Sequence, residues 1–339
     1  MRHFITTHDW SKEDLQSLLN VATGLKGNRY QALLAGKTIA LLFLNPSLRT
    51  RASFQIGADQ LGAHAIVLEP GNGAWGIEFD HGKLMDGDAE EHIQEVAGVL
   101  SRYCDMICMR AFPKFQDWQY DRSDPWIRTL EKFAEVPVIN METIIHPCQE
   151  LALMQTLQEK LGDVSGKQLT VTWTWHPKPL NTAVANSAIM IATKFGMNVK
   201  LLCPNADYLL DEQFITAAQS NAADSGGSFN VTHDIEDGYG GSDVIYAKSW
   251  GALPFYGDPT SAQASAEQYK HFIVDEQKMN MTNNALFSHC LPLRRNVKAT
   301  DAVMDADYCV AIDEAENRLH VQKAVMLNLL GVDQSEVQS

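Results

Sequence analysis

Short, uninterrupted apolar runs recur along this chain and limit its possible folds more than any other feature. The first run, residues 38–44, follows Gly36 and ends at Asn45 and Pro46. Such a run predicts a strand buried on both faces, whereas a strand exposed on one face alternates apolar and polar residues. Between the runs lie stretches with apolar residues at helical spacing, such as 11–26. The alternation predicts an α/β fold with parallel sheets flanked by helices.

The same reading gives bounds for each element. The expected strands are 38–44, 64–68, 105–109, 137–140, 168–175, 199–203, 229–233, 243–247, 286–290 and 309–312. The expected helices are 11–26, 49–61, 90–103, 148–161, 181–195, 211–223 and 318–330.

A chain of 339 residues is long enough for two domains. The alternation restarts after 162–166, so we expect the junction at the helix that begins near Pro147. Dinucleotide-binding domains carry a glycine fingerprint directly after a strand. The nearest candidate here, residues 238–241, precedes a strand, so dinucleotide binding is not expected.

The balance of charged residues limits which molecules the protein is expected to bind. There are 27 Lys and Arg residues against 42 Asp and Glu residues, a net charge of −15, which disfavours nucleic acid as a partner. No apolar run approaches the ~18 residues of a membrane-spanning helix, and the first residues are too polar for a secretory signal. The six cysteines lack zinc-site spacing, so we expect reduced thiols, no bound metal and a cytoplasmic location.

Residues 45–51, which follow the first strand and open a helix, are the most informative segment for function. Backbone N–H groups at a helix N-terminus bind anions, and Ser47, Arg49 and Thr50 add further donors. Alternatively, Ser47 is only an N-cap and the arginines lie in solvent. Two arginines at the positive end of a helix are unfavourable without an anion, which favours a phosphate site.

Three motifs together resemble the aspartate/ornithine carbamoyltransferase superfamily. They are Ser-x-Arg-Thr-Arg at 47–51, His-Pro-Cys-Gln at 146–149 and His-Cys-Leu-Pro at 289–292. The resemblance implies two-domain α/β enzymes that work as homotrimers and transfer a carbamoyl group from carbamoyl phosphate to an amine without metal or organic cofactor. It implies a carbamoyl-phosphate-binding domain at 1–145, with the helix at 317–331 packed back on it, and an amino-acid-binding domain at 146–316.

The resemblance also implies a carbamoyl phosphate site. Its expected members are Ser47, Leu48, Arg49, Thr50, Trp75, Arg110, His146, Gln149, Cys290, Leu291 and Arg318. The expected catalytic residues are Arg49, Arg110, His146, Gln149, Cys290 and Arg318. Cys290 and Leu291 are expected to act through their backbone carbonyls. Arginines suit the chemistry because negative charge develops on the carbonyl oxygen and the departing phosphate.

The acceptor site departs from the ornithine pattern. Ornithine enzymes place an aspartate, which pairs with the free α-ammonium, where this chain has Lys248. A cation there repels an α-ammonium, so a substrate with a masked α-amine is favoured. By resemblance, the acceptor is held by Glu90, Glu142, Lys248, Leu291, Arg294 and Lys298, and the Lys298 amine is a candidate for carboxylation.

Glu90 bears on which acyl group is accepted. By resemblance, succinylornithine enzymes have an uncharged residue at this position, and Glu90 would repel the succinyl carboxylate, which favours N-acetylornithine. The glycine-rich loop 71–76 presents Trp75, which we expect to reach a neighbouring subunit. N-succinylornithine and ornithine are the alternative acceptors, and a non-catalytic phosphate- or nucleotide-binding protein is the alternative class.

Overall fold

The computed structural model describes residues 1–333 and 337, and these divide into two compact units. Unit 1 contains residues 1–113, 119–148 and the C-terminal segment from Asn317. Unit 2 contains residues 114–118 and 149–316. Each unit holds one main parallel sheet flanked by helices, which confirms the predicted fold class.

The sheet of unit 1 has the strand order β2-β1-β5-β6, and all its pairs are parallel. Its strands are β1 (Thr38–Phe43), β2 (His64–Leu68), β5 (Met106–Arg110) and β6 (Val138–Glu142). β1 pairs with a strand on either side, with Ile39 opposite both Ala65 and Met106. This interior position explains why the run at 38–44 has no polar alternation.

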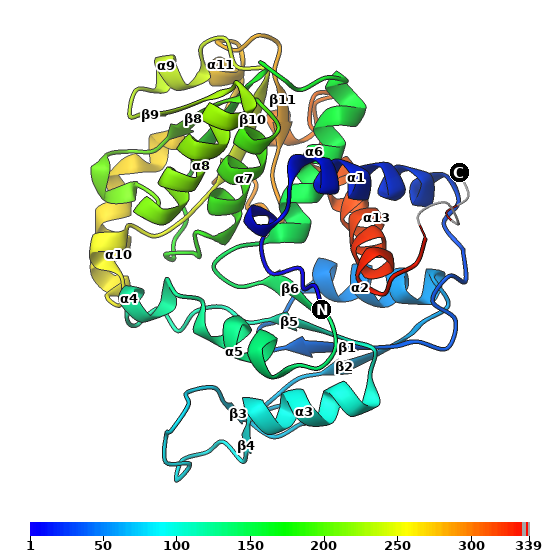
Figure 1. Ribbon diagram of the computed structural model, residues 1–339. Helices are drawn as coiled ribbons and strands as arrows, with labels where there is room; N and C mark the ends of the chain where they lie inside the picture. The colour runs from blue at the N-terminus through cyan, green and yellow to red at the C-terminus, as the bar shows by residue number, and fades with distance from the viewer. Residues whose placement is uncertain (334–336, 338–339) are drawn as a thin grey trace. The chain divides into compact units, whose positions relative to one another are not determined.

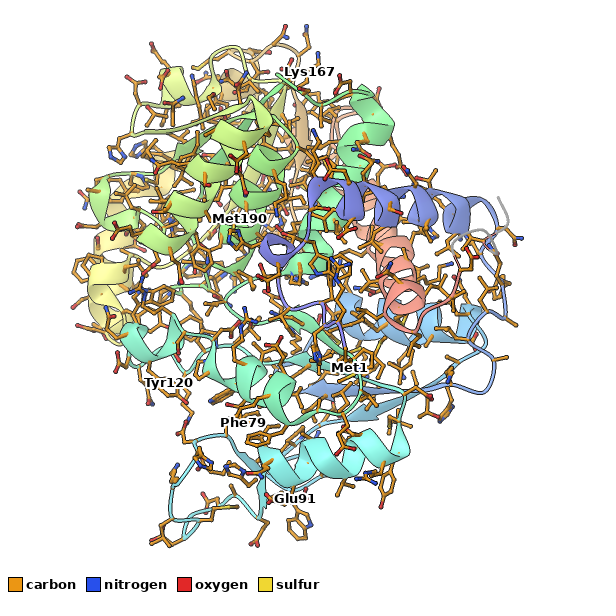
Figure 2. All side chains as sticks on the ribbon, in the orientation of Figure 1. Met1, Phe79, Glu91, Tyr120, Lys167 and Met190 are labelled. Atoms are coloured by element: carbon orange, nitrogen blue, oxygen red, sulfur yellow. The ribbon has the colours of Figure 1, made fainter. Side chains whose placement is uncertain are left out.

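Helices cover both faces of this sheet. Those of unit 1 are α1 (Lys12–Gly27), α2 (Leu48–Gln60), α3 (Ile93–Tyr103) and α5 (Pro125–Phe133). Ala40 and Leu42 of β1 share a core with apolar residues of α3 and α5. Figure 1 shows these two helices on one face, with α2 on the other. Phe79, labelled in Figure 2, stacks on Trp126 of α5 at 4.5 Å between ring centroids.

A small parallel ribbon extends unit 1 beyond its main sheet. Its strands are β3 (Ile77–Glu78) and β4 (Glu91–His92). The short helices η1 (Thr7–Asp9) and α4 (Trp118–Asp121) complete the first part of the chain. In the ribbon Ile77 lies opposite Glu91, so the ribbon brings the segment containing Trp75 beside the segment containing Glu90.

The sheet of unit 2 has the parallel order β11-β10-β7-β8-β9. Its strands are β7 (Gln168–Trp173), β8 (Asn198–Leu202), β9 (Ser228–Thr232), β10 (Val244–Lys248) and β11 (Leu286–Ser288). Two of its helices, α7 (Ala183–Lys194) and α8 (Glu212–Ser225), pack side by side on this sheet (Figure 1). The remaining helices of the chain are α6 (Pro147–Leu161), η2 (Ala206–Tyr208), α9 (Ile235–Tyr239), η3 (Leu253–Phe255), α10 (Pro259–Ala266), η4 (Glu267–Phe272), α11 (Glu276–Met279), α12 (Asp301–Met304) and α13 (Ala311–Leu329). From Asn317 onward, α13 belongs to unit 1.

The structure corrects two helix starts. The helix expected at 90–103 begins at Ile93, because the His92 side chain accepts a hydrogen bond from the Gln94 N–H and caps it. Glu90 therefore precedes β4 and is not in the first turn of a helix. The helix expected at 318–330 begins at Ala311, so Arg318 lies well inside it and does not open it.

A third correction concerns the strand expected at 309–312. Cys309 makes only an isolated bridge with Phe287, and α13 follows at once. The apolar run is too short to separate a strand from a buried helix start. The acidic side chains Asp313 and Glu314 favour the positive end of a helix at this point.

The predicted functional residues follow the carboxyl ends of parallel strands, which is where α/β sheets hold ligands. In unit 1, β1 leads to Ser47, β5 ends on Arg110, and β6 ends on Glu142 shortly before His146. In unit 2, β10 ends on Lys248 and β11 leads to Cys290.

Candidate active site

The N-terminus of α2 is built as the motif predicts. The Ser47 side chain accepts a hydrogen bond from the Thr50 N–H at 3.2 Å, so Ser47 is the N-cap. The first turn contains no acidic residue. Arg51 pairs with Glu69 at 2.7 Å, and Arg49 is half-buried. Leu48 is exposed and Thr50 is buried.

Arg110, at the end of β5, forms a buried ion pair with Glu142 at the end of β6. Its Cζ atom lies 4.5 Å from the centre of the Phe112 ring. Its buried Nε has no hydrogen-bond partner among the described residues. A buried ion pair is costly to desolvate and contributes little to stability, so an arginine kept there with a spare donor fits an anion site.

His146 connects this pair to α13. Its Nε2 lies 3.3 Å from a carboxylate oxygen of Glu142 and 3.2 Å from Nη1 of Arg318. Nη2 of Arg318 donates to the Thr50 hydroxyl at 3.3 Å. All of these side chains are buried. Unit 1 therefore gathers two guanidinium groups, an imidazole and the capped end of α2 into one cluster, which we call the phosphate cluster (Thr50, Arg110, Glu142, His146 and Arg318).

Gln322, one helical turn after Arg318, holds that arginine in place. Its surroundings orient the amide oxygen toward the guanidinium, where it accepts from Nε at 3.2 Å and from Nη2 at 2.9 Å. In this orientation its nitrogen donates to the Ser53 hydroxyl at 2.7 Å. Gln322 is fully buried, so its amide fixes a donor group that the sequence motif alone does not explain.

In unit 2, Gln149 is anchored by a buried carboxylate. Its Nε2 donates to Glu314, which lies in the first turn of α13. Glu314 also accepts from the hydroxyls of Tyr246 and Ser288. Tyr246 is on β10, and Ser288 is the last residue of β11, directly before the His-Cys-Leu-Pro motif. Glu314 therefore links two of the three motif segments to one acceptor.

A second group of side chains in unit 2 is cationic. The pKa of Lys298 is lowered to about 7, first by burial and then by Lys248 and Arg294, although Cys290 raises it. The pKa of His176 is lowered to about 4, first by burial and then by Lys298, Arg294 and Lys248, although its backbone hydrogen bond with Lys178 raises it. We call Lys248, Arg294 and Lys298 the cationic cluster, and His176 is the neutral imidazole beside it. Positive groups gathered at one place form a site for an anion.

The His-Cys-Leu-Pro motif adopts an unusual backbone beside this cluster. Leu291 has a φ of 51°, in the left-handed region that side chains other than glycine seldom occupy. Its N–H donates to Nδ1 of His289 at 2.8 Å, which holds the turn. Strained backbone of this kind is typical of segments that present main-chain groups to a ligand.

Trp75 and Glu90 belong to two neighbouring segments of unit 1. Both side chains are exposed, and the β3–β4 ribbon places their segments side by side. The Glu91 N–H donates to the Gly76 carbonyl at 3.3 Å. Glu91, labelled in Figure 2, marks this edge of the molecule.

One predicted site residue lies in a different group from the one that we expected. Glu142, expected with the acceptor residues, lies in the phosphate cluster. His176, Gln322 and Glu314 were not predicted. His176 lies three residues after the end of β7 and could have been found as a polar residue near the carboxyl end of a buried strand. Gln322 and Glu314 act through partners distant in sequence and left no local signal.

In the part of the chain that the structure describes, no group of His, Cys, Asp or Glu side chains could hold a metal ion. Among the helices of residues 1–333, none is long and apolar enough to cross a membrane.

Comparison with known proteins gives consistent matches. Residues 2–159 match the family "Aspartate/ornithine carbamoyltransferase, carbamoyl-P binding domain", and residues 167–329 match its "Asp/Orn binding domain". N-acetylornithine carbamoyltransferase of Xanthomonas campestris pv. campestris is 61% identical over 333 residues, covering 98% of both chains. N-succinylornithine carbamoyltransferase of Bacteroides fragilis is 35% identical over 322 residues, covering 94% of this chain and 95% of the relative.

A solved structure agrees with the sequence matches. Acetylornithine transcarbamylase complexed with acetylcitrulline superposes with a TM-score of 0.96 and 61% identity, covering 97% of this chain and 99% of that chain.

Proposed function

The chain belongs to the aspartate/ornithine carbamoyltransferase family, and we propose that it transfers the carbamoyl group of carbamoyl phosphate to the δ-amine of N-acetyl-L-ornithine. The products are N-acetyl-L-citrulline and phosphate, in arginine biosynthesis. The observation that carries the proposal is the full-length 61% identity to N-acetylornithine carbamoyltransferase. The cationic cluster agrees with it, because these groups favour an α-carboxylate over an α-ammonium.

The reaction is a group transfer with no redox step. The neutral δ-amine attacks the carbonyl carbon, a C–N bond forms, and the C–O bond to phosphate breaks as phosphate leaves with the electron pair. The nitrogen then loses a proton to water or to the departing phosphate. Negative charge builds up on the carbonyl oxygen and the phosphate, so fixed donors and good positioning account for most of the catalysis.

Those donors come from the phosphate cluster and from the first turn of α2. Phosphate is bound by Arg49, Arg110 and Arg318, by backbone N–H groups at Ser47–Thr50 and by the Thr50 hydroxyl. Arg110 and His146 also contact the carbonyl oxygen, while Gln149 and the backbone carbonyls of Cys290 and Leu291 hold the carbamoyl NH₂. The buried position of Arg110 and its spare Nε support this assignment.

The acceptor is held by Lys248, Arg294 and Leu291, with Glu142 and Glu90 on its acylated side. We extend the proposal to Lys298, whose lowered pKa leaves a large neutral fraction at pH 7. A neutral amine adds to CO₂, forming an N–C bond and releasing a proton, to give a carbamate. That anion would offset the positive charge of Lys248 and Arg294 around it.

We place carbamoyl phosphate on residues 1–145 with the C-terminal helix, and the acceptor on 146–316. The assembly we propose is a homotrimer in which Trp75 completes the adjacent subunit's site, since an exposed tryptophan in a glycine-rich loop fits a shared site. The proposed compartment is the cytoplasm, consistent with the six cysteines being free.

The test is a carbamoylation assay with ornithine, N-acetylornithine and N-succinylornithine side by side, each with carbamoyl phosphate. We expect phosphate release and ureido product with N-acetylornithine at the highest kcat/KM. Preference for another acceptor would contradict the assigned substrate. Absence of phosphate release with all three, from folded protein, would contradict the enzymatic function and favour a binding module.

A further inference from the structure

Glu314 is a fully buried carboxylate outside the three sequence motifs. It accepts hydrogen bonds from Nε2 of Gln149 and from the hydroxyls of Tyr246, at 2.9 Å, and Ser288. Its own N–H donates to the Val310 carbonyl at 3.0 Å, which places it in the first turn of α13. The positive end of the helix and three donors together stabilise a negative charge at this position.

A carboxylate constrains Gln149 in a way that a neutral partner does not. The two ends of a glutamine amide have nearly the same shape, so the hydrogen-bond partners decide which end faces which way. An ionised carboxylate only accepts, so the NH₂ end of Gln149 must face Glu314. Rotating the amide by half a turn would place two acceptor oxygens against each other in a buried site.

We propose that Glu314 is a positioning residue for carbamoyl transfer: it orients the Gln149 amide so that the oxygen, and not the NH₂ group, is presented to the carbamoyl NH₂. This inference rests on the proposed function, in which Gln149 contacts the carbamoyl group. An acceptor at that point fixes the carbamoyl plane, whereas a donor would repel the NH₂ group. Glu314 touches no substrate and acts through the groups that it holds, above all Gln149.

The same carboxylate also anchors Ser288, whose hydroxyl donates to it. This residue ends β11 and precedes the segment that contains Cys290 and Leu291. One buried acceptor thus orients the side chain and anchors the strand end that would both contact the carbamoyl NH₂. The arrangement explains why a charged residue is buried here at a desolvation cost.

The test begins with Glu314→Gln, which keeps the shape but offers both a donor and an acceptor. Tyr246 and Ser288 can adapt because a hydroxyl either donates or accepts. The Gln149 amide loses its orientation, so we expect kcat to fall about 10-fold or more, while KM for N-acetylornithine changes less than about twofold.

A double-mutant cycle separates positioning from structure. In a Gln149→Ala background, Glu314→Gln should lower kcat by no more than about twofold further, because nothing remains to be oriented. The matched control is Tyr246→Phe, which removes a different donor from the same carboxylate. It should lower Tm by a few degrees yet keep kcat within about twofold of wild type.

The outcomes distinguish the inference from the function it rests on. If the wild-type protein transfers no carbamoyl group, both the proposed function and the positioning role are overturned. Active wild type with normal kcat in folded Glu314→Gln, or an equal kcat loss from Glu314→Gln with and without Gln149, would overturn the positioning role alone. If Glu314→Gln does not fold, Glu314→Asp is measured in the same cycle. Its shorter side chain withdraws the carboxylate from Gln149, and the same loss and the same coupling are expected.

Discussion

The phosphate cluster of unit 1 and the cationic cluster of unit 2 both concentrate positive charge, but they balance it differently. In unit 1, Arg110 and His146 share the Glu142 carboxylate. In unit 2, Lys248 and Arg294 both lower the pKa of Lys298, whereas Cys290 raises it. The first cluster contains its own counter-ion, whereas the second achieves balance by losing a proton.

Because the two clusters balance their positive charge differently, we expect them to bind an anion differently. A phosphate entering unit 1 competes with a resident carboxylate for permanently charged guanidinium groups. An anion at the unit 2 cluster instead meets an amine whose charge depends on pH and on what is bound. The expected effects below follow from this contrast, from the largest to the smallest.

Removal of an arginine that we expect to bind phosphate should have the largest effect. We expect Arg49→Ala and Arg110→Ala each to lower carbamoyl transfer by about 10²-fold or more, because charge-assisted donors to the leaving phosphate are lost. Arg110→Ala should also lower the free energy of unfolding by about 3–5 kcal/mol, since it leaves Glu142 buried without its arginine.

The matched control is the double variant Arg110→Ala with Glu142→Gln. Denaturant titration should show most of the lost stability recovered, while the assay should show activity still absent. Activity close to wild type in either single arginine variant, with folding verified by circular dichroism, would mean that the phosphate site has been misplaced.

Loss of the Lys298 amine comes next. If a carbamate on Lys298 balances its cationic neighbours, Lys298→Ala should lower kcat/KM for N-acetylornithine about 30-fold or more, and Lys298→Glu should lower it less. ¹³C NMR in ¹³C-labelled bicarbonate should show one carbamate carbon resonance that disappears in Lys298→Ala.

A buried lysine of unit 1 provides the comparison. Burial lowers the pKa of Lys323 to about 8, but its amine donates to the Arg29 carbonyl at 3.0 Å and to the Gln60 side chain at 2.9 Å. An ammonium held by carbonyl oxygens is not a nucleophile, so the resonance should survive in Lys323→Met. A signal that persists in Lys298→Ala would show that another amine reacts.

Acyl selectivity should change more modestly. Glu90 is exposed in the single chain, so screening by solvent reduces its repulsion of a succinyl carboxylate. We expect Glu90→Pro to shift the ratio of kcat/KM for N-succinylornithine over N-acetylornithine by about 10-fold in favour of the succinyl substrate. Glu91→Pro, at the neighbouring exposed position, is the control. An equal shift in both variants would show a loop effect instead of a charge effect.

The smallest effect concerns stability and pH. In the folded protein the pKa of Lys298 is lowered to about 7 from 10.5, so between these values the unfolded chain binds one more proton than the folded protein. Stability should therefore rise with pH in this window, by at most about 1.4 kcal/mol per pH unit from this group. Denaturant titrations at pH 7 and 8 in CO₂-free buffer should show this rise in wild type and lose it in Lys298→Met.

Much of unit 1 and unit 2 could be predicted from local patterns. The apolar run at 38–44 identified β1 because an interior parallel strand leaves no polar alternation. Ser47 is the N-cap of α2, as the alternative interpretation of its segment stated, because capping is decided within three residues. The helix at 90–103 was placed too early because the acidic pair Glu90 and Glu91 resembles a first turn. The actual cap, His92, is an uncommon one.

The parts of the candidate site that could not be predicted depend on distant partners. Glu314 meets Gln149 across 165 positions, and the contact between Arg318 and Thr50 spans 268. Short-range periodicity carries no information about such pairs. The residues expected to touch substrate stay a prediction, and the buried side chains that contact them, such as Gln322 and Glu314, could not be found from the sequence.

The path of the chain through unit 1 has a consequence for how the protein is made. Unit 1 begins at the first residue yet includes the segment from Asn317, and Lys323 of that segment donates to the Leu25 carbonyl and to Gln60. The ribosome synthesises α1 and α2 first and the segment from Asn317 last. During the synthesis of unit 2, α1 and α2 therefore lack their contacts with this segment. At roughly 5–20 residues per second this interval lasts on the order of ten seconds or more. Nascent chains should therefore need protection on unit 1, although it is the unit that emerges first.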